Sequence, residues 1–109
     1  MSMEIIAEAA IAHDGVLDRA LLLVRAAAAA GPDAVKFQIV IADELATQDY
    51  QHYETFRMCE LPLEAWQRLV GVAHDAAMRF YVDIFGEESL ELALQAGVDG
   101  VIEMTKLTN

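Results

Sequence analysis

The stretch AVKFQIVI at residues 34–41 decides the fold of this chain. Its β-branched and aromatic residues are typical of a strand buried in a sheet. Gly31-Pro32 stands just before it and indicates the end of a helix, because glycine readily adopts the left-handed conformation after a last helical turn and proline cannot continue the helix. The sequence around this stretch repeats the same step from helix to strand.

Similar signals mark the helix and strand boundaries in the rest of the chain. AGPDAV at residues 30–35 is matched by AGVDGV at residues 96–101, where a helix again ends on Ala-Gly and a strand follows an Asp. Asp14 and Ser89 are candidate N-caps, and Pro62 is placed to open a helix as its first residue. We expect strands over Glu4–Ala10, Ala34–Ile41, Phe80–Phe85 and Gly100–Met104, and helices over Leu17–Ala30, Leu63–Met78, Ser89–Ala96 and, inside a long loop, Tyr50–Met58.

The order βαβαβαβ predicts a parallel sheet with right-handed crossovers. The expected fold class is α/β, a partial TIM-type barrel of four parallel strands, with residues 1–109 in a single domain. A closed barrel of this type has eight strands, so the chain would supply half of one.

The composition limits the partners and the location that can be expected for this chain. The 109 residues include 7 basic and 18 acidic ones, for a net charge of −11, which disfavours nucleic acid and anionic membrane surfaces as partners. No apolar run is long enough to span a membrane. A single cysteine excludes a disulfide within the chain, and we expect a cytoplasmic protein.

The polar side chains of the predicted strands mark the candidate site. Side chains alternate along a strand, so Lys36 and Gln38 share the face opposite Val35 and Phe37. We expect the apolar face to meet the helices and Lys36 and Gln38 to point into the barrel, near the carboxyl ends of the strands where barrel active sites lie. Glu8 of the first strand and Asp83 of the third are expected beside them.

A lysine in a buried strand is costly unless it is paired or used. Lys36 is therefore either one half of a Lys36–Glu8 ion pair that only fixes the core, or a cation for an anionic ligand or a proton-transfer residue. Strand four is ambiguous, because either Glu103 or its neighbours Ile102 and Met104 could face Lys36; the internal repeat favours the second pair.

His13 directly follows the first predicted strand. It either contributes to the site or closes the loop with a hydrogen bond. No HxH, CxxC or HExxH spacing is present, so the sequence itself indicates no metal site.

Several of these residues also carry a family resemblance. IIAE at residues 5–8, His13-x-Gly15 and AGPDAVKFQ at residues 30–38 resemble IAEIGxNHNG and AGADAVKFQ of the N-acetylneuraminate (sialic acid) synthase family. YExF at 53–56, ELP at 60–62 and LTN at 107–109 are similar to further stretches of the family. The resemblance covers essentially the whole chain and implies the N-terminal half of the family's barrel.

Members of that family are (βα)8 barrels that condense phosphoenolpyruvate with N-acetylmannosamine or a similar sugar, assisted by Mn²⁺ or Mg²⁺. The resemblance implies that Glu8 contacts the acceptor sugar, that Lys36 lies near phosphoenolpyruvate and that Gln38 lines the site. It also implies a homodimer, in which a small antifreeze-protein-like domain caps the partner's site.

Three family motifs differ here. The family's NHNG, STPF and KIASG are AHDG at residues 12–15, VDIF at 82–85 and VIEMT at 101–105. The family's phosphoenolpyruvate-binding lysine and serine on strand four are thus replaced, and Lys106 would need a register shift to substitute.

Three hypotheses follow: a synthase of this family acting as part of a complete barrel, a non-catalytic half-barrel kept for binding or assembly, or a protein for a cationic or amino-sugar ligand. In each case four open strands leave two edges and one sheet face uncovered. We expect the chain to self-associate or to pair with a missing C-terminal half, and to be inactive alone.

Overall fold

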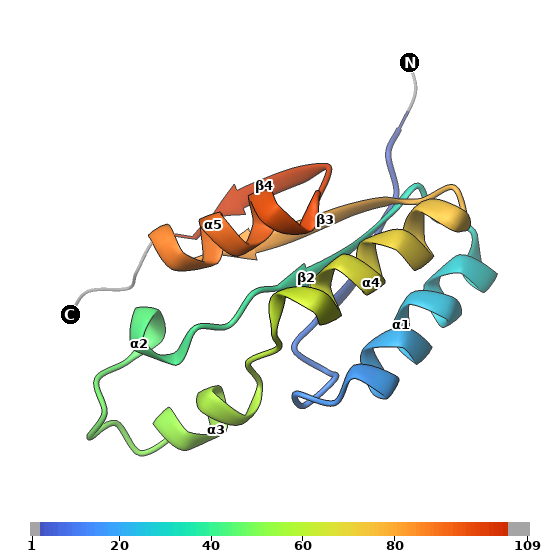
Figure 1. Cartoon of the computed structure of the whole chain (residues 1–109). Coiled ribbons are helices and arrows are strands. Elements are labelled where there is room, and N and C mark those ends of the chain that lie inside the picture. The colour runs from blue at the N-terminus through green and yellow to red at the C-terminus, as the bar shows by residue number, and fades with distance from the viewer. Residues whose placement is uncertain (1–2, 105–109) are drawn as a thin grey trace.

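The computed structural model describes residues 3–104 and shows one four-stranded sheet with helices packed against it (Figure 1). The strands lie in the order β1-β2-β3-β4, and all neighbours are parallel. This confirms the predicted α/β, half-barrel-like fold. The elements are β1 (Ile6–Ala10), α1 (Leu17–Ala30), β2 (Ala34–Gln38), α2 (Ala42–Leu45), α3 (Tyr53–Met58), α4 (Leu63–Asp75), β3 (Arg79–Ile84), α5 (Glu87–Ala96) and β4 (Gly100–Glu103).

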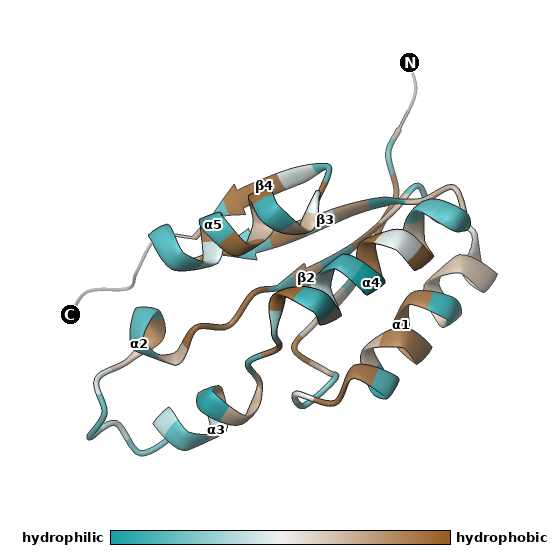
Figure 2. Ribbon diagram, in the orientation of Figure 1, coloured by the Kyte–Doolittle hydropathy of each residue, from teal (hydrophilic) through white to brown (hydrophobic). Residues whose placement is uncertain are grey.

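The core lies between the sheet and α1, α4 and α5. The side chains of Val35, Phe37 and Ile39 are fully buried there, as the alternation predicts. Phe37 stacks on Phe80 of β3 at 5.4 Å between ring centroids, and Trp66 of α4 packs edge-on against both rings. Figure 2 shows the hydrophobic colour running from β2 into the segment before α2. One sheet face is therefore committed to the helices, and the other stays open.

The helix ends follow the glycine signals. α1 ends at Ala30 and α5 ends at Ala96, with Gly31 and Gly97 in the left-handed conformation, as predicted. The predictions of where the helices begin are less accurate. Val16 rather than Asp14 precedes α1, and Pro62 precedes α4 instead of being its first residue.

The start of α5 also differs from the prediction. Gly86 is its N-cap, and Ser89 lies three residues later. Ser89 still closes the turn, because its Oγ accepts hydrogen bonds from the Phe85 and Gly86 amides at 3.0 and 3.2 Å. The short helix α2 was not predicted, and α3 begins three residues later than Tyr50.

The register between β3 and β4 decides which residues of β4 lie on the same face as Lys36. Asp83 pairs with Ile102 and Ile84 pairs with Glu103. Neighbours in register share a face of the sheet, so Ile102 lies on the Lys36 face, as the internal repeat indicated. Glu103 lies on the helix side of the sheet, so the prediction that Glu103 could face Lys36 is wrong.

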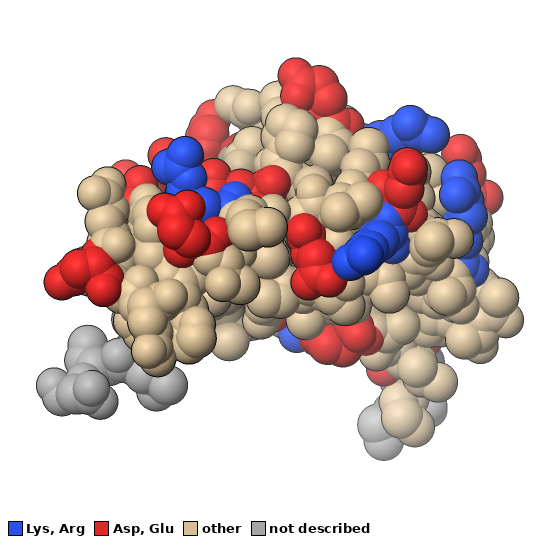
Figure 3. Space-filling model, turned by 90° about the horizontal axis from the view of Figure 1, so that it is seen from below, with Lys and Arg blue, Asp and Glu red and all other residues tan. Residues whose placement is uncertain are grey.

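The outer surface carries charges of both signs. On the face shown in Figure 3, basic side chains lie next to acidic ones, with broad uncharged areas between them. In the described residues, no helix has the length and apolar character needed to cross a membrane.

Candidate functional site

Lys36 is at the centre of the open sheet face. It lies on β2 between β1 and β3, in register with Glu8 on one side and Tyr81 on the other. Its Nζ lies 3.1 Å from Glu8 Oε2 and 3.3 Å from Asp83 Oδ1. The sequence prediction that Lys36, Glu8 and Asp83 share a face is therefore confirmed.

The two carboxylates keep Lys36 protonated. The hydrogen bond to Glu8 raises the pKa of Lys36, burial opposes it, and the charge of Asp83 raises it further. Lys36 is thus an ammonium donor at neutral pH rather than a general base. Its side chain is 19% exposed, so it is not fully enclosed by the described residues.

Asp83 and Gln38 form the next layer toward the carboxyl end of the sheet. Asp83 is only 3% exposed, and its Oδ2 accepts a long hydrogen bond of 3.5 Å from Gln38 Nε2. Its Oδ1 has no hydrogen bond among the described residues, although it lies at ion-pair distance from Lys36. A buried carboxylate with incomplete hydrogen bonding has room for one further donor. Gln38 and Asp83 therefore form a polar pair beside the lysine.

His13 lies on the other side of the sheet. It is fully buried, and its ring packs 6.0 Å from Phe37 and 6.1 Å from Trp66. Its Nδ1 accepts a 2.8 Å hydrogen bond from the Gly15 amide, which is the loop-closing alternative. Burial lowers the pKa of His13, so its ring is neutral at pH 7. The structure does not bring His13 together with Lys36.

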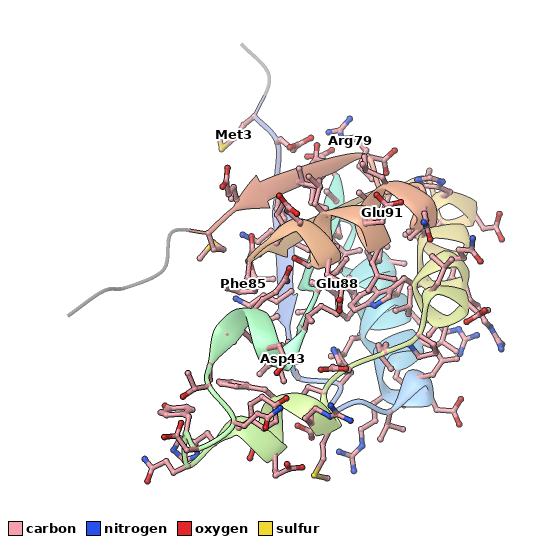
Figure 4. All side chains as sticks on the ribbon, turned by 60° about the vertical axis from the view of Figure 1, so that its left-hand side comes forward. Met3, Asp43, Arg79, Phe85, Glu88 and Glu91 are labelled. Atoms are coloured by element: carbon pink, nitrogen blue, oxygen red, sulfur yellow. The ribbon has the colours of Figure 1, made fainter. Side chains whose placement is uncertain are left out.

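A second polar group lies on the same face around Tyr81, and its members Glu4 and Arg79 were missed from the sequence. Tyr81 Oη lies 2.9 and 3.0 Å from the two carboxylate oxygens of Glu4, and Arg79 Nε donates to Tyr81 Oη at 3.0 Å. Arg79 and Glu4 also form an ion pair. Figure 4 shows Arg79 at the start of β3, at the opposite end of the strand from Phe85. The alternation Arg79, Tyr81, Asp83 was a signal that could have found this group.

The described residues do not fit the divalent cation that the resemblance implies. In residues 3–104, no three His, Cys, Asp or Glu side chains gather as metal ligands. The two carboxylates nearest the centre, Glu8 and Asp83, already face the Lys36 ammonium. Lys106 and the LTN at 107–109 lie outside the described residues.

No family model matches the chain, but individual relatives do. It is 57% identical to the spore coat polysaccharide biosynthesis protein SpsE of Bacillus subtilis over 51 residues, which is 47% of this chain and 14% of SpsE. It is 35% identical to the N,N'-diacetyllegionaminic acid synthase of Legionella pneumophila over 112 aligned positions, which cover 90% of this chain and 32% of that enzyme.

Solved structures of similar proteins also match this chain. The N-acetylneuraminic acid (sialic acid) synthetase of Leptospira borgpetersenii, solved with citrate, superposes with a TM-score of 0.84 at 25% identity over 93% of this chain and 35% of that one. The crystal structure of B. subtilis SpsE gives a TM-score of 0.71 at 32% identity over 94% of this chain and 30% of that one. The chain thus spans about a third, or less, of these relatives, and it belongs to the sialic acid synthase-like family.

Proposed function

We propose that this chain forms part of a barrel that condenses phosphoenolpyruvate with N-acetylmannosamine or a related sugar. The observation that supports this most is the Lys36 centre: a protonated, partly exposed lysine between two carboxylates on the face that a barrel would enclose. Two of the relatives are named as sugar-acid synthases, and the L. borgpetersenii enzyme was solved with the anion citrate.

Each residue of the centre has a chemical role in this proposal. The Lys36 ammonium attracts the carboxylate or phosphate of phosphoenolpyruvate and stabilises the negative charge of the reacting substrate. Glu8, whose side chain is 48% exposed, accepts hydrogen bonds from sugar hydroxyls. Gln38 orients Asp83, and Asp83 holds Lys36 in place.

A second candidate function has its own support. Lys36 already has two carboxylate neighbours, whose charges outnumber its own and leave no net positive charge for a trianionic substrate. That balance suits an amino sugar or another cationic ligand, bound to Glu8 and Asp83. A half-barrel kept only for binding or assembly would also have this arrangement.

One assay separates these functions. The chain is combined with the remaining part of the L. pneumophila synthase as a second polypeptide, and phosphate release from phosphoenolpyruvate and N-acetylmannosamine is measured with Mn²⁺ present. We expect release with the wild-type chain and none with Lys36→Met. Equal release by both chains, or release by neither while both partners are folded, would contradict the proposed condensation.

A further inference from the structure

The two edges of the sheet carry much of the exposed apolar surface. In residues 3–104, β1 and β4 each have a partner strand on one side only. Eleven large hydrophobic side chains of this part of the chain are exposed, and six of them lie in these two strands or within three residues of them: Met3, Ile5, Ile6, Val101, Ile102 and Met104. Backbone groups along such an edge are free to pair with a further strand. Both edges are therefore suited to strand addition.

The side chains of the two edges match face for face. Ile6 of β1 and Ile102 of β4 lie on the open face and are 40% and 43% exposed. The acidic residues of the two strands lie on opposite faces, Glu8 on the open face and Glu103 on the helix side. Joining a β4 edge to a β1 edge with their faces matched brings isoleucine to isoleucine and keeps the two carboxylates apart.

A second copy of the chain can supply these edges in the correct direction. All four strands are parallel and lie in sequence order across the sheet. A two-fold axis along the strands keeps the strand direction when it relates one copy to the other, so β4 of each copy meets β1 of its partner. Two copies then close at eight strands, the number of a TIM-type barrel.

The register of the sheet fits this closure. Three pairings lead from one edge to the other: Ile6 with Ala34, Ala34 with Arg79, and Tyr81 with Gly100. By these pairings Ile6 is level with Val98, so Ile102 lies four positions nearer the carboxyl end. A barrel of this type has a total offset of about 8 residues, or about 4 for each half. The right-handed twist directs this offset toward the amino end of the next strand. Ile102 therefore comes opposite Ile6 of the second copy.

The charge of the open face also allows two copies to approach. The charged side chains that the strands and the preceding Glu4 place on this face are three acids and two bases: Glu4, Glu8, Asp83, Lys36 and Arg79. They sum to −1, against −11 for the whole chain. All five belong to ion pairs on the face itself. Most of the negative charge therefore lies away from the surface that the two copies would enclose.

We propose that two copies of this chain close an eight-stranded barrel, in which β4 of each copy pairs with β1 of the other and Ile102 of one copy contacts Ile6 of its partner. The two open faces then enclose one interior with two Lys36 centres, so each candidate site is completed by the other copy. This inference does not rest on the proposed condensation, because assembly is measured without substrate.

Disulfide cross-linking tests the contact. Ile6→Cys and Ile102→Cys chains are mixed, refolded together from urea and oxidised, and each variant is treated alone in parallel. We expect disulfide-linked dimers in the mixture and not in either variant alone, because the two-fold axis brings residue 6 to residue 102 and not to its own copy. The wild-type chain controls for the buried native Cys59. Leu94→Cys, at an exposed position of α5, replaces Ile102→Cys in a second control mixture and should give no more than background.

Two cross-linking results would overturn the proposal. One is linkage within a single variant as strong as in the mixture, which would show that like edges meet. The other is a mixture that links no better than the Leu94→Cys control.

Sedimentation of the wild-type chain gives an answer that needs no variant to fold. Two closed seams stop assembly at the dimer, at twice the 12.0 kDa of the chain. Species that keep growing with concentration would contradict closure. A monomer that associates only when the remaining part of the L. pneumophila synthase is added would also overturn the proposal, because the edges would then serve the rest of a barrel. Neither measurement detects phosphate release, so failure here is distinct from failure of the condensation.

Discussion

At the scale of single residues, Lys36 shows how burial changes the contribution of an ion pair to the stability of the fold. Asp83, at 3% exposure, depends on Lys36 for its nearest positive charge. Removing one partner leaves the other buried and uncompensated. The shorter Arg19–Asp14 pair, at 2.8 Å, has side chains 60% and 67% exposed, so solvent screens it.

Lys36→Met should therefore lower the free energy of unfolding by about 1–3 kcal/mol, reduced from the cost of a fully buried pair because Glu8 is half exposed. Arg19→Ala is the control and should change it by less than about 1 kcal/mol. Urea denaturation measures both. Equal effects of the two substitutions would show that the Lys36 pairs contribute no more than a surface pair.

Gly15 shows a different constraint. Its φ is +77°, and a Cβ there would lie 1.7 Å from the Met58 carbonyl oxygen. Gly31 has nearly the same φ, +78°, with nothing within 4 Å of an added Cβ. Gly31→Ala should cost roughly 1–2 kcal/mol for the backbone conformation alone, and Gly15→Ala roughly 1–3 kcal/mol more for the collision. Thermal unfolding of the two variants compares them, and similar losses would mean that the Met58 contact is relieved cheaply.

His13 gives the fold a pH dependence. Burial lowers its pKa in the folded chain below the ordinary 6.5, and Asp14 only partly offsets this. The unfolded chain then binds the proton more readily, so the stabilising contribution is complete above pH 6.5 and is lost as the pH falls from there through the lower pKa of the folded chain.

We expect the stability of the wild-type chain to fall more steeply between pH 7 and 5 than that of His13→Asn, whose side chain can still accept from the Gly15 amide. Chemical denaturation at several pH values measures the slopes. His52→Asn changes an exposed histidine and should keep the wild-type slope. A wild-type slope in His13→Asn would contradict this role.

At the scale of elements, the start of α5 depends on Ser89. Its fully buried hydroxyl accepts from two amides and donates to the Gly86 carbonyl at 3.1 Å. Ser89→Ala should cost about 1–2 kcal/mol, because it leaves buried amides unpaired. Thr47→Ala, at an exposed loop position, should stay within about 0.5 kcal/mol. Denaturant midpoints compare them, and a neutral Ser89→Ala would show that water replaces the hydroxyl.

Elements set by local signals could be predicted from the sequence. The bounds of α1 were predicted correctly, because Gly31 fixes its end and the apolar spacing fixes its length. The face that holds Lys36, Gln38 and Asp83 followed from the alternation of side chains alone. The start of α2 could not be predicted, because the carboxylate that satisfies it, Glu60, comes from a distant position in the sequence. The amino end of α5 was predicted only in part: Ser89 was identified from the sequence, but the carboxylate of Glu44 was not.

His13 illustrates the same limit for the site. Its place after β1 was compatible with either role, and the positive φ of Ala10 and Asp14 shapes the turn that holds it. The choice was made by Phe37 and Trp66, which enclose the ring from two other elements.

At the scale of the whole molecule, the sheet is covered on one side only. β1 and β4 are its edges, and Ile6 and Ile102 on the open face are 40% and 43% exposed. Unpaired edges and exposed apolar side chains favour association. We expect the chain to self-associate or to bind the rest of a barrel.

Sedimentation at micromolar concentration measures this. Because each copy carries a net charge of −11, self-association should strengthen as added salt screens the repulsion between copies. A well-folded monomer at every salt concentration would contradict the expectation of self-association.

The central claim is that Lys36 is the anion-binding centre of this part of a synthase-like barrel. Calorimetric titration of phosphoenolpyruvate into the chain, combined with the remaining part of the L. pneumophila synthase, tests it most directly. The wild-type chain should bind, and Lys36→Met, shown by circular dichroism to be folded, should not. Unchanged binding by Lys36→Met, or no binding by the folded wild-type combination, would contradict the claim.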